Sequence, residues 1–231
     1  MEAPVSERLA PSRFHERYYH LRELRKQIED VAKRYLANRN APTLVDFGCG
    51  SMPYRPIFDR FSVRYTGIDL PRNSKADLHA SVDDATPMAA ESADIVLSTQ
   101  VLEHVVSPPR YLEECHRILK PEGLLILTTH GYWMYHPDPT DFWRWTGPGL
   151  RKVIGGVGYE ILECRGVMGL AASGMHLFQD GLLRKVPRPA RPILAFLMQF
   201  AVGACDWLSS DAERANDACV FVVVARKQKR N

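Results

Sequence analysis

The chain has 231 residues, of which 45% are hydrophobic and 25% are charged. This length and composition suit one domain with a well-buried core and exclude wholesale disorder. A formal net charge of +3 is too small for a dedicated nucleic-acid binder, which concentrates Lys and Arg on one face. We therefore expect a globular protein without a nucleic-acid partner.

The cysteines and the apolar segments indicate a cytoplasmic location. Five cysteines are scattered without a C-x-x-C pair, which argues against a zinc module and for a reducing compartment. The N-terminus lacks the apolar core of a signal peptide. The most apolar stretch, Ile193–Cys205, contains Gln199 and is shorter than the roughly 20 residues that a spanning helix needs.

The first half of the chain alternates predicted helices and strands. Apolar residues at spacings of three and four predict an amphipathic N-terminal helix over residues 13–38. The apolar run TLVDF reads as a buried strand that enters a glycine-rich turn, after which Ser51 is a plausible N-cap. The alternation predicts an α/β fold, a parallel sheet with helices on its faces. The strands expected here are 43–47, 63–69, a short element near 76–80, 93–99 and 123–130, with helices to about residue 60 and after Pro108-Pro109.

The pattern changes after His130. A proline-rich and aromatic-rich loop at 131–148 is expected on the substrate side, followed by a short helix. A strand over 158–167, an apolar helical region over about 175–209 and a last strand over 218–227 complete the chain. Because no linker divides the sequence, we predict a single domain over 1–231 with a helical insertion at 168–217.

A glycine turn follows the first predicted strand. Gly48 and Gly50 let a tight turn form and let a ligand approach the backbone, and Asp69 ends the next strand, where a carboxylate can accept both hydroxyls of a ribose. The dinucleotide-binding motif G-x-G-x-x-G requires a third glycine at the position that Pro53 occupies in this chain. Asp46 would repel a pyrophosphate but attract a cation, which favours S-adenosylmethionine.

Four segments carry a family resemblance: VDFGCGSMPYRPIF, TGIDL, DDATPMAAESADIVLSTQVLEHV and HRILKPEGLLILTT. In order and spacing they resemble the motifs of class I S-adenosylmethionine-dependent methyltransferases of the Methyltransf_11 type, over about residues 40–165. The resemblance implies a Rossmann-like, seven-stranded, mostly parallel sheet with helices on both faces. Its last strand would run antiparallel between strands five and six.

The same resemblance implies a cofactor site. Asp46, Gly48, Cys49 and Gly50 would cradle the methionine moiety, and Asp69 would hold the ribose. Glu103-His104 is interpreted as ordering the loop after the fourth main strand. The other implied contacts are Leu70 against the adenine, Asp84 and Ala85 near its amino group, and Thr99 and Gln100 beside the methionine end.

The segment His136–Thr146 follows the fifth strand, at the edge where the ligand crevice is expected. His136 is the first candidate for a general base, oriented by Asp138 or Asp141, and His130 is the second. Trp143 and Trp145 could stack on a sugar or ring. In the alternative reading the loop is structural, with Asp141 capping the next helix and the aromatic residues filling the core.

The chemistry of this loop leaves several functions open. The same His136, Asp138 and Asp141 could instead bind Mg²⁺ or Mn²⁺, since carboxylates and one imidazole suit those ions better than zinc. Together with GCGxxPYR, the segment resembles bacterial methyltransferases of polysaccharide and glycolipid biosynthesis, which implies O-methylation of a sugar or glycolipid hydroxyl. The alternatives are O- or N-methylation of another small-molecule metabolite, and a non-catalytic S-adenosylmethionine-binding protein.

The predicted helices at 175–209 carry a wide apolar stripe. Core packing or a homodimer interface would explain it. A peripheral membrane contact is the other hypothesis, because Arg184, Lys185, Arg188 and Arg191 lie nearby.

Overall fold

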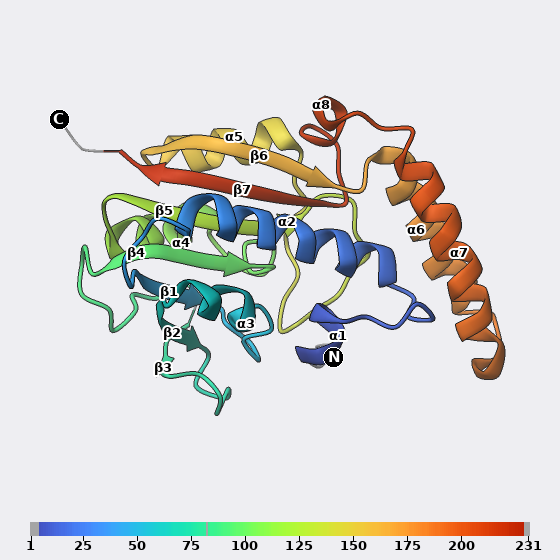
Figure 1. Ribbon diagram of the computed structural model, residues 1–231, viewed down its shortest axis with the longest axis horizontal. Helices are drawn as coiled ribbons and strands as arrows, with labels where there is room; N and C mark the ends of the chain where they lie inside the picture. Colours follow the sequence, from blue (N-terminus) through green and yellow to red (C-terminus); the bar gives the residue numbers. More distant parts are fainter. Residues whose placement is uncertain (1–4, 82, 229–231) are drawn as a thin grey trace.

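The computed structural model describes residues 5–81 and 83–228. All strands of that part form one seven-stranded sheet in the order β3-β2-β1-β4-β5-β7-β6 (Figure 1). In chain order the elements are α1 (Val5–Leu9), α2 (Tyr18–Leu36), β1 (Thr43–Phe47), α3 (Arg55–Phe58), η1 (Asp59–Phe61), β2 (Arg64–Asp69), β3 (Leu78–His79), β4 (Ala93–Thr99), α4 (Pro108–Ile118), β5 (Leu119–His130), α5 (Gly147–Gly156), β6 (Tyr159–Val167), α6 (Leu170–Leu183), η2 (Arg188–Ala190), α7 (Arg191–Asp206), α8 (Asp211–Arg214) and β7 (Val220–Lys227).

The direction of the strands confirms the expected fold. β3, β2, β1, β4 and β5 are parallel, whereas β7 is antiparallel to both of its neighbours, β5 and β6. The last strand therefore lies between the fifth and the sixth main strands, as the resemblance implied. The central parallel strands β1, β4 and β5 are buried on both faces over most of their length and are accordingly rich in Val, Ile and Leu, whereas β2 and β3 at the edge are partly exposed.

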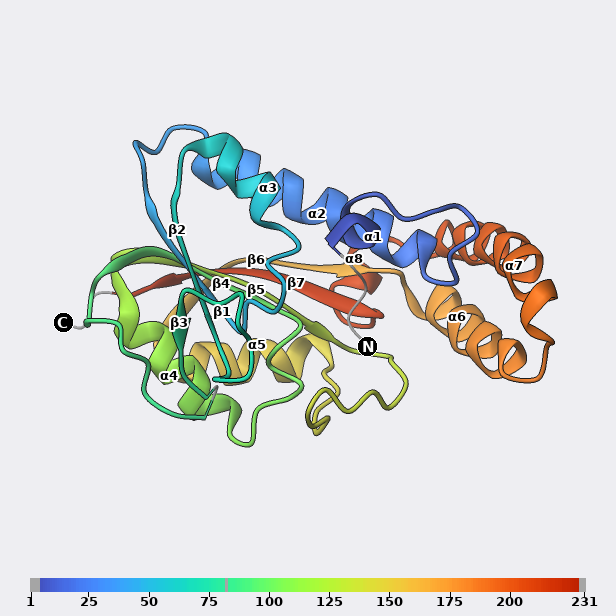
Figure 2. The same ribbon diagram turned by 90° about the horizontal axis from the view of Figure 1, so that it is seen from below.

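Helices cover both faces of the sheet (Figure 2). On one face, α4 and α5 pack through Tyr111, Leu112 and Leu150 against Phe47, Val96 and other strand residues. On the other face, α2 and α3 pack through residues such as Leu24, Ile28 and Phe58, together with Ala172 of α6 and Val202 of α7. The sheet thus separates two apolar cores, which makes it the rigid support of the loops at its edge.

Several element boundaries differ from those that the periodicity predicts. The N-terminal helix begins at Tyr18 rather than near residue 13. The ring of His15 accepts the amide of Arg17 at 3.0 Å, a local turn that competes with helix formation. Ser51 does not cap α3, which begins at Arg55. Met52 adopts a left-handed φ of 55° and extends the glycine turn before the helix can start.

The insertion between β6 and β7 is a helical hairpin of α6 and α7, followed by α8. None of the helices in the described ranges is both long enough and apolar enough to cross a membrane. All five cysteines are free thiols.

Candidate active site

The motif residues meet at the carboxyl edge of the parallel strands. The strand order reverses between β1 and β4, because β1 leads to β2 on one side and β4 leads to β5 on the other. Open α/β sheets bind ligands in the crevice at such a switch point. The ends of β1, β2 and β4 therefore bring Asp46, Asp69 and Thr99 to one edge.

The turn after β1 depends on its two glycines. Gly48 and Gly50 have φ angles of +80° and +52°, in the left-handed region that favours glycine. A Cβ at Gly48 would lie 2.5 Å from Cγ2 of Val101. The amides of Gly48 and Cys49 both donate to the carbonyl of Ile68, at 2.8 and 3.0 Å. The turn is therefore tied to β2 and closely approached by the loop after β4. Cys49 as a whole is almost fully buried, so its expected contact with the methionine moiety stays a prediction.

Asp46 is a buried carboxylate with one unused oxygen. Its Oδ2 accepts a hydrogen bond from the Tyr65 hydroxyl, whereas its buried Oδ1 has no partner. Burial, with a contribution from the nearby Asp69, raises the pKa of Asp46 to about 7. An unpaired buried carboxylate oxygen is costly unless a cation compensates it. The arrangement therefore fits the cationic end of S-adenosylmethionine, the group that the resemblance implies.

Asp69 organises the turn as well as facing the crevice. Its Oδ2 accepts the Gly50 amide at 2.8 Å and the Asn73 side-chain amide at 2.7 Å, and its Oδ1 accepts the Leu70 amide at 2.7 Å. A carboxylate has about four acceptor positions, so Oδ1 retains capacity for a ligand hydroxyl. Leu70 is partly exposed beside it. The predicted roles of Asp69 and Leu70 are compatible with these positions.

Gln100 follows Thr99 at the end of β4 in an unusual conformation. It has a φ of +59°, rare for a residue with a side chain, and its amide donates to the carbonyl of Thr128 at 2.9 Å. Its buried Nε2 has no partner. Such an outlier at the crevice, with an unused donor, supports a ligand-binding role.

In the part of the chain that the structure describes, Asp84 and Ala85 form no hydrogen bond or ion pair with the other motif residues. Both are exposed. They line a hollow of about 240 Å³ that faces Arg110 and Arg117 of α4. Their expected place near the adenine stays a prediction.

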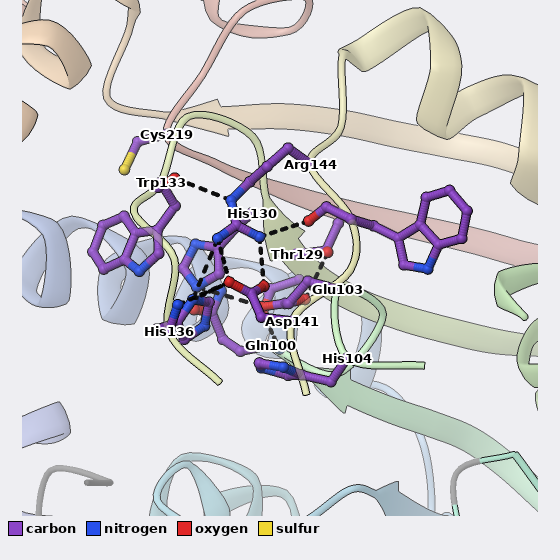
Figure 3. A network of polar contacts seen from close by, with 12 residues as sticks. Gln100, Glu103, His104, Thr129, His130, Trp133, His136, Asp141, Arg144 and Cys219 are labelled. Carbon is purple, nitrogen blue, oxygen red and sulfur yellow. Dashed lines mark hydrogen bonds and ion pairs between the residues drawn. The ribbon is translucent and has the colours of Figure 1, made fainter. Parts of the chain in front are cut away.

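The loop between β5 and α5 holds a second polar cluster (Figure 3). Asp141 receives two hydrogen bonds from Arg144, at 2.6 and 2.7 Å, and accepts the amide of His136 at 2.8 Å. The Nδ1 atom of His136 lies 3.3 Å from Oδ2 of Asp141 and 3.2 Å from the carbonyl of Met134. Asp141 thus orients His136 and does not cap α5, whose N-cap is Thr146.

The electrostatics keep His136 neutral and Asp141 ionised. Burial lowers the pKa of His136 and outweighs the opposite effect of Asp141. Burial also raises the pKa of Asp141, but the hydrogen bonds from Arg144 and the His136 amide outweigh it and hold the pKa below its ordinary value. A neutral imidazole with a carboxylate near one nitrogen is equipped to act as a base.

Asp138 does not join this cluster. Its carboxylate is half exposed, and its ion-pair partner is Arg72 at 3.9 Å. Of the two residues expected to orient His136, Asp138 or Asp141, the structure therefore brings Asp141 into contact with it. The predicted cation ligands His136, Asp138 and Asp141 are not brought together either. The groups with metal-ligand spacing are instead Glu103 with His130 and His136, and His104 with His136 and Asp141.

Glu103 and His130 form a buried pair beside His136. Their Oε1 and Nε2 atoms are 3.4 Å apart, and Thr129 donates to Oε2 of Glu103 at 2.7 Å. Burial raises the pKa of Glu103 and lowers the pKa of His130 well below its usual range, so both favour their neutral forms. Oε1 of Glu103 and Nδ1 of His130 have no hydrogen-bond partner. Each residue of the pair thus keeps one buried polar atom without a hydrogen bond.

Glu103 and His104 were expected to order the loop after β4, in which they lie, and the structure shows them bonded to the loop after β5. The Glu103 carbonyl accepts the amides of Phe142 and Trp143 at 2.8 and 3.1 Å. The Nδ1 atom of His104 contacts the carbonyl of Thr140. The sequence reading, however, assigned no role to the Glu103 carboxylate, because its pairing with His130 becomes visible only when β4 and β5 are adjacent.

The aromatic residues of the loop are placed differently from the expectation. Trp143 stacks on Trp145 at 5.9 Å, and its Nε1 donates to the carbonyl of Val105. Trp133, which the sequence reading did not single out, stacks on His130 with ring centroids 4.5 Å apart. It also stacks on His176 of α6 at 5.3 Å and lies under the guanidinium of Arg17. The only feature of the sequence that could have pointed to Trp133 is its place three residues after His130, the histidine that ends a predicted strand.

The strand order and the turn after β1 are those that the resemblance to class I methyltransferases implied. A family model, Methyltransf_23, described as a methyltransferase domain, matches residues 15–154, which is more than half of the chain. The chain therefore belongs to this methyltransferase family.

Curated relatives match in the same region. The chain is 37% identical over 99 residues to a ubiquinone biosynthesis O-methyltransferase of Cereibacter sphaeroides, covering 37% of this chain and 40% of the relative. It is 33% identical over 141 residues to an uncharacterized methyltransferase of Mycobacteroides abscessus, covering 53% and 52%. The chain thus spans about half or less of the length of these relatives. They do not support the expected resemblance to methyltransferases of polysaccharide and glycolipid biosynthesis.

Solved structures share the fold at low identity. A putative sarcosine dimethylglycine methyltransferase from Galdieria sulphuraria has a TM-score of 0.57 at 17% identity, over 90% of this chain and 88% of that one. A phosphoethanolamine N-methyltransferase of Haemonchus contortus, solved with S-adenosyl-L-methionine, has a TM-score of 0.58 at 14% identity, over 99% and 61%. The [4+2]-cyclase SpnF scores 0.58 at 22% identity, over 88% and 81%. The fold alone therefore does not define the reaction.

Proposed function

We propose that the protein is an S-adenosylmethionine-dependent O-methyltransferase that acts on a hydroxyl group of a small molecule. The observation that supports S-adenosylmethionine as the cofactor is the buried Oδ1 of Asp46, which has no partner and lies beside the turn with two glycines. Membership of the methyltransferase family supports the same reading. The observation that favours a hydroxyl acceptor is the neutral His136, oriented by Asp141.

The cofactor residues divide the work by position. Asp46 would hold the cationic end, Gly48 and Gly50 would let the backbone approach, and Asp69 would accept a ribose hydroxyl through Oδ1. Gln100 would use its free Nε2. When bound, S-adenosylmethionine supplies a methyl group that its sulfonium makes electrophilic. The protein then contributes mainly alignment, and holding two reactants in attack geometry contributes roughly 7–11 kcal/mol.

The acceptor side provides a base. The Nδ1 contacts of His136 with Met134 and Asp141 favour the tautomer that carries its proton on Nδ1, which leaves Nε2 free to take a hydroxyl proton. Asp141 remains ionised and stabilises the imidazolium that forms. Glu103 and His130 offer their unused atoms to the acceptor hydroxyl from the neighbouring strand ends. General-base catalysis of this kind contributes about 10²- to 10⁴-fold.

We propose a hydroxyl on an aromatic ring as the acceptor. The name of the Cereibacter sphaeroides relative indicates an O-methyltransferase of ubiquinone biosynthesis. Ubiquinone is a benzoquinone, and the reduced form of such a ring is aromatic and carries phenolic hydroxyls. A phenolic hydroxyl has a pKa near 10 and is deprotonated far more readily by an imidazole than a sugar hydroxyl is. Trp133, stacked on His130, provides a flat apolar surface next to the base.

Calorimetry with S-adenosylmethionine and with NAD tests the cofactor assignment. We expect binding of the first and none of the second. The acceptor is tested by incubating the protein and S-adenosylmethionine with a catechol and, separately, with a nucleotide sugar, and by following the mass gain of one methyl group. Binding of NAD alone would overturn the function, and methylation of the sugar alone would overturn the acceptor class.

A further inference from the structure

The helical hairpin of α6 and α7 projects from the body of the molecule, beyond the end of the sheet (Figures 1 and 2). Its two helices pack against one another, and only its inner side meets the N-terminal part of α2 and the loop before it.

The inner side of the hairpin combines polar side chains with small apolar ones, among them the buried Ala172, Ala195 and Val202. Gln199 donates to Oε1 of Gln179 at 2.7 Å and to the carbonyl of Glu16 at 2.7 Å, and its own Oε1 accepts the amide of Tyr19. The hydroxyl of Tyr19 donates to Asp206 at 2.9 Å. These glutamines and Asp206 are almost fully buried. Hydrogen bonds of this kind hold the hairpin to the body without using its large apolar side chains.

The outer side is apolar and faces solvent. Among the described residues, nine of the fifteen large hydrophobic side chains that are exposed lie between positions 170 and 208. Phe200 is 80% exposed and Trp207 is 85% exposed. Soluble monomers rarely leave such a contiguous apolar surface uncovered, so it indicates an interaction site. The nine side chains are Leu170, Leu177, Phe178, Ile193, Phe196, Leu197, Phe200, Trp207 and Leu208.

The charge at the turn end of this surface has one sign. The turn between the two helices carries Arg184, Lys185 and Arg188, all exposed, and Arg191 at the start of α7. Between Asp180 and Asp206 the sequence contains no acidic residue. Basic side chains flanking exposed Phe, Leu and Trp are the combination that binds the interface of an anionic lipid bilayer.

We propose that the α6–α7 hairpin docks the protein on an anionic membrane surface. The apolar outer side enters the headgroup region, and the basic turn pairs with lipid phosphates. The inner side remains in contact with the acceptor loop, because His176 of α6 stacks on Trp133 and Arg184 contacts Met134. Docking would therefore place the acceptor side of the site close to the lipid. The docking surface is separate from the catalytic residues and can be tested without an acceptor.

Co-sedimentation of the full chain with lipid vesicles tests the proposal. We expect binding to vesicles that contain phosphatidylglycerol, weaker binding to pure phosphatidylcholine, and a loss of binding as salt increases. The double variant Phe196→Ser/Phe200→Ser should weaken binding at least tenfold. Arg184→Gln and Arg188→Gln should each weaken binding to the anionic vesicles about fivefold.

Matched controls separate docking from general surface effects. Val106→Ser and Arg60→Gln change an exposed apolar side chain and an exposed charge elsewhere, and both should bind vesicles as the unaltered protein does. All of these side chains are exposed, and the ring of Phe196 contacts the likewise exposed ring of Phe14, with centroids 5.4 Å apart. The melting temperatures should therefore stay close to that of the unaltered protein. Failure to bind anionic vesicles, or equal binding by Phe196→Ser/Phe200→Ser, overturns the proposal. Concentration-dependent dimerisation that this variant abolishes, without vesicle binding, would assign the surface to a second copy instead.

Discussion

At the scale of single residues, Asp46 shows a conflict between stability and binding. Burial raises its pKa from 3.8 to about 7, so the folded protein favours the protonated carboxyl whereas the unfolded chain loses that proton near pH 4. The stabilising contribution of Asp46 is therefore complete below about pH 4 and is lost as the pH rises to about 7. At higher pH the fold carries an uncompensated buried charge, which a cationic ligand can offset.

We predict that Asp46→Asn raises the melting temperature at pH 8 while weakening S-adenosylmethionine binding at least tenfold. The amide removes the buried charge and, with it, the attraction for a cation. Thermal unfolding at pH 5.5 and pH 8, with calorimetry at pH 8, measures both effects. Tyr65→Phe is the matched control, since it removes the hydrogen-bond partner of Asp46 but keeps the charge, and should bind within a few-fold of the unaltered protein. Unchanged affinity in Asp46→Asn would refute the role.

We predict that His136→Ala lowers turnover at least tenfold and leaves cofactor affinity within a few-fold. The base is lost, but His136 lies on the acceptor loop and outside the glycine turn. Because burial lowers the pKa of His136, kcat measured at saturating S-adenosylmethionine, where the protonation of Asp46 no longer limits cofactor binding, should decline only at a pH below about 6.5, the ordinary histidine value. Steady-state kinetics across pH provide the test.

Asp138→Asn is the control for that variant. Its carboxylate faces Arg72 rather than His136, so its turnover should stay within about twofold of the unaltered protein. Normal turnover in His136→Ala would remove His136 from the role of base, and a loss in Asp138→Asn equal to that in His136→Ala would contradict the loop geometry.

At the scale of elements, strand ends and turns carry the cofactor site. Gly48 shows this most clearly. Its φ is left-handed, and the side chain of Val101 occupies the space where a Cβ at this position would lie. Gly174, in the interior of α6, has nothing within 4 Å of the same position. The two glycines therefore differ in physical role although the sequence shows the same residue.

We predict opposite effects for alanine at these two positions. Gly48→Ala should lower the melting temperature and weaken S-adenosylmethionine binding at least tenfold, because the left-handed backbone and the Val101 contact both oppose a Cβ. Gly174→Ala should stabilise the protein by about 0.5–1 kcal/mol, since glycine is unfavourable inside a helix. Thermal unfolding and calorimetry on both variants provide the comparison. Equal stability of the two variants would show that the turn tolerates a side chain.

The sequence predicts the strands and the glycine turn well because their signals are local. TLVDF before GCG, and TGID before a turn, each specify a buried strand and its end within a few residues. The acceptor side was less predictable. Asp138 and Asp141 are three residues apart, and only the two hydrogen bonds from Arg144 decide which of them reaches His136. The Glu103–His130 pair depends on the adjacency of β4 and β5, which no local pattern contains.

The helical insertion illustrates the same limit for a whole element. Its apolar stripe was visible in the sequence, but periodicity does not show whether a stripe faces the core or solvent. The structure places Gln199 and Asp206 on the buried side and Phe200 on the exposed side. Polar residues spaced along α7 marked the packed face, contrary to the usual pattern of a globular helix.

At the scale of the whole molecule, the residues of the crevice come from separate segments that meet only when the chain folds. β1 and β2 supply Asp46 and Asp69, β4 leads to Gln100, and the loop after β5 supplies His136. A ligand that binds only the folded state stabilises it by mass action.

We predict that S-adenosylmethionine at one hundred times its dissociation constant raises the melting temperature by about 5–10 °C. This corresponds to about 2.7 kcal/mol of ligand stabilisation in a domain of this size. Differential scanning fluorimetry measures the shift, with NAD at the same concentration as the control. An equal shift with both ligands would show that the crevice does not distinguish them.

The position of β7 has a consequence for biosynthesis. Val220–Lys227 fills the gap between β5 and β6, so those two strands stay unjoined until this late segment has been translated. Until then the nascent chain presents two bare strand edges, which are templates for pairing with other chains. A premature stop codon before Val220 would therefore yield an aggregating product, even though every motif residue of the crevice had already been made.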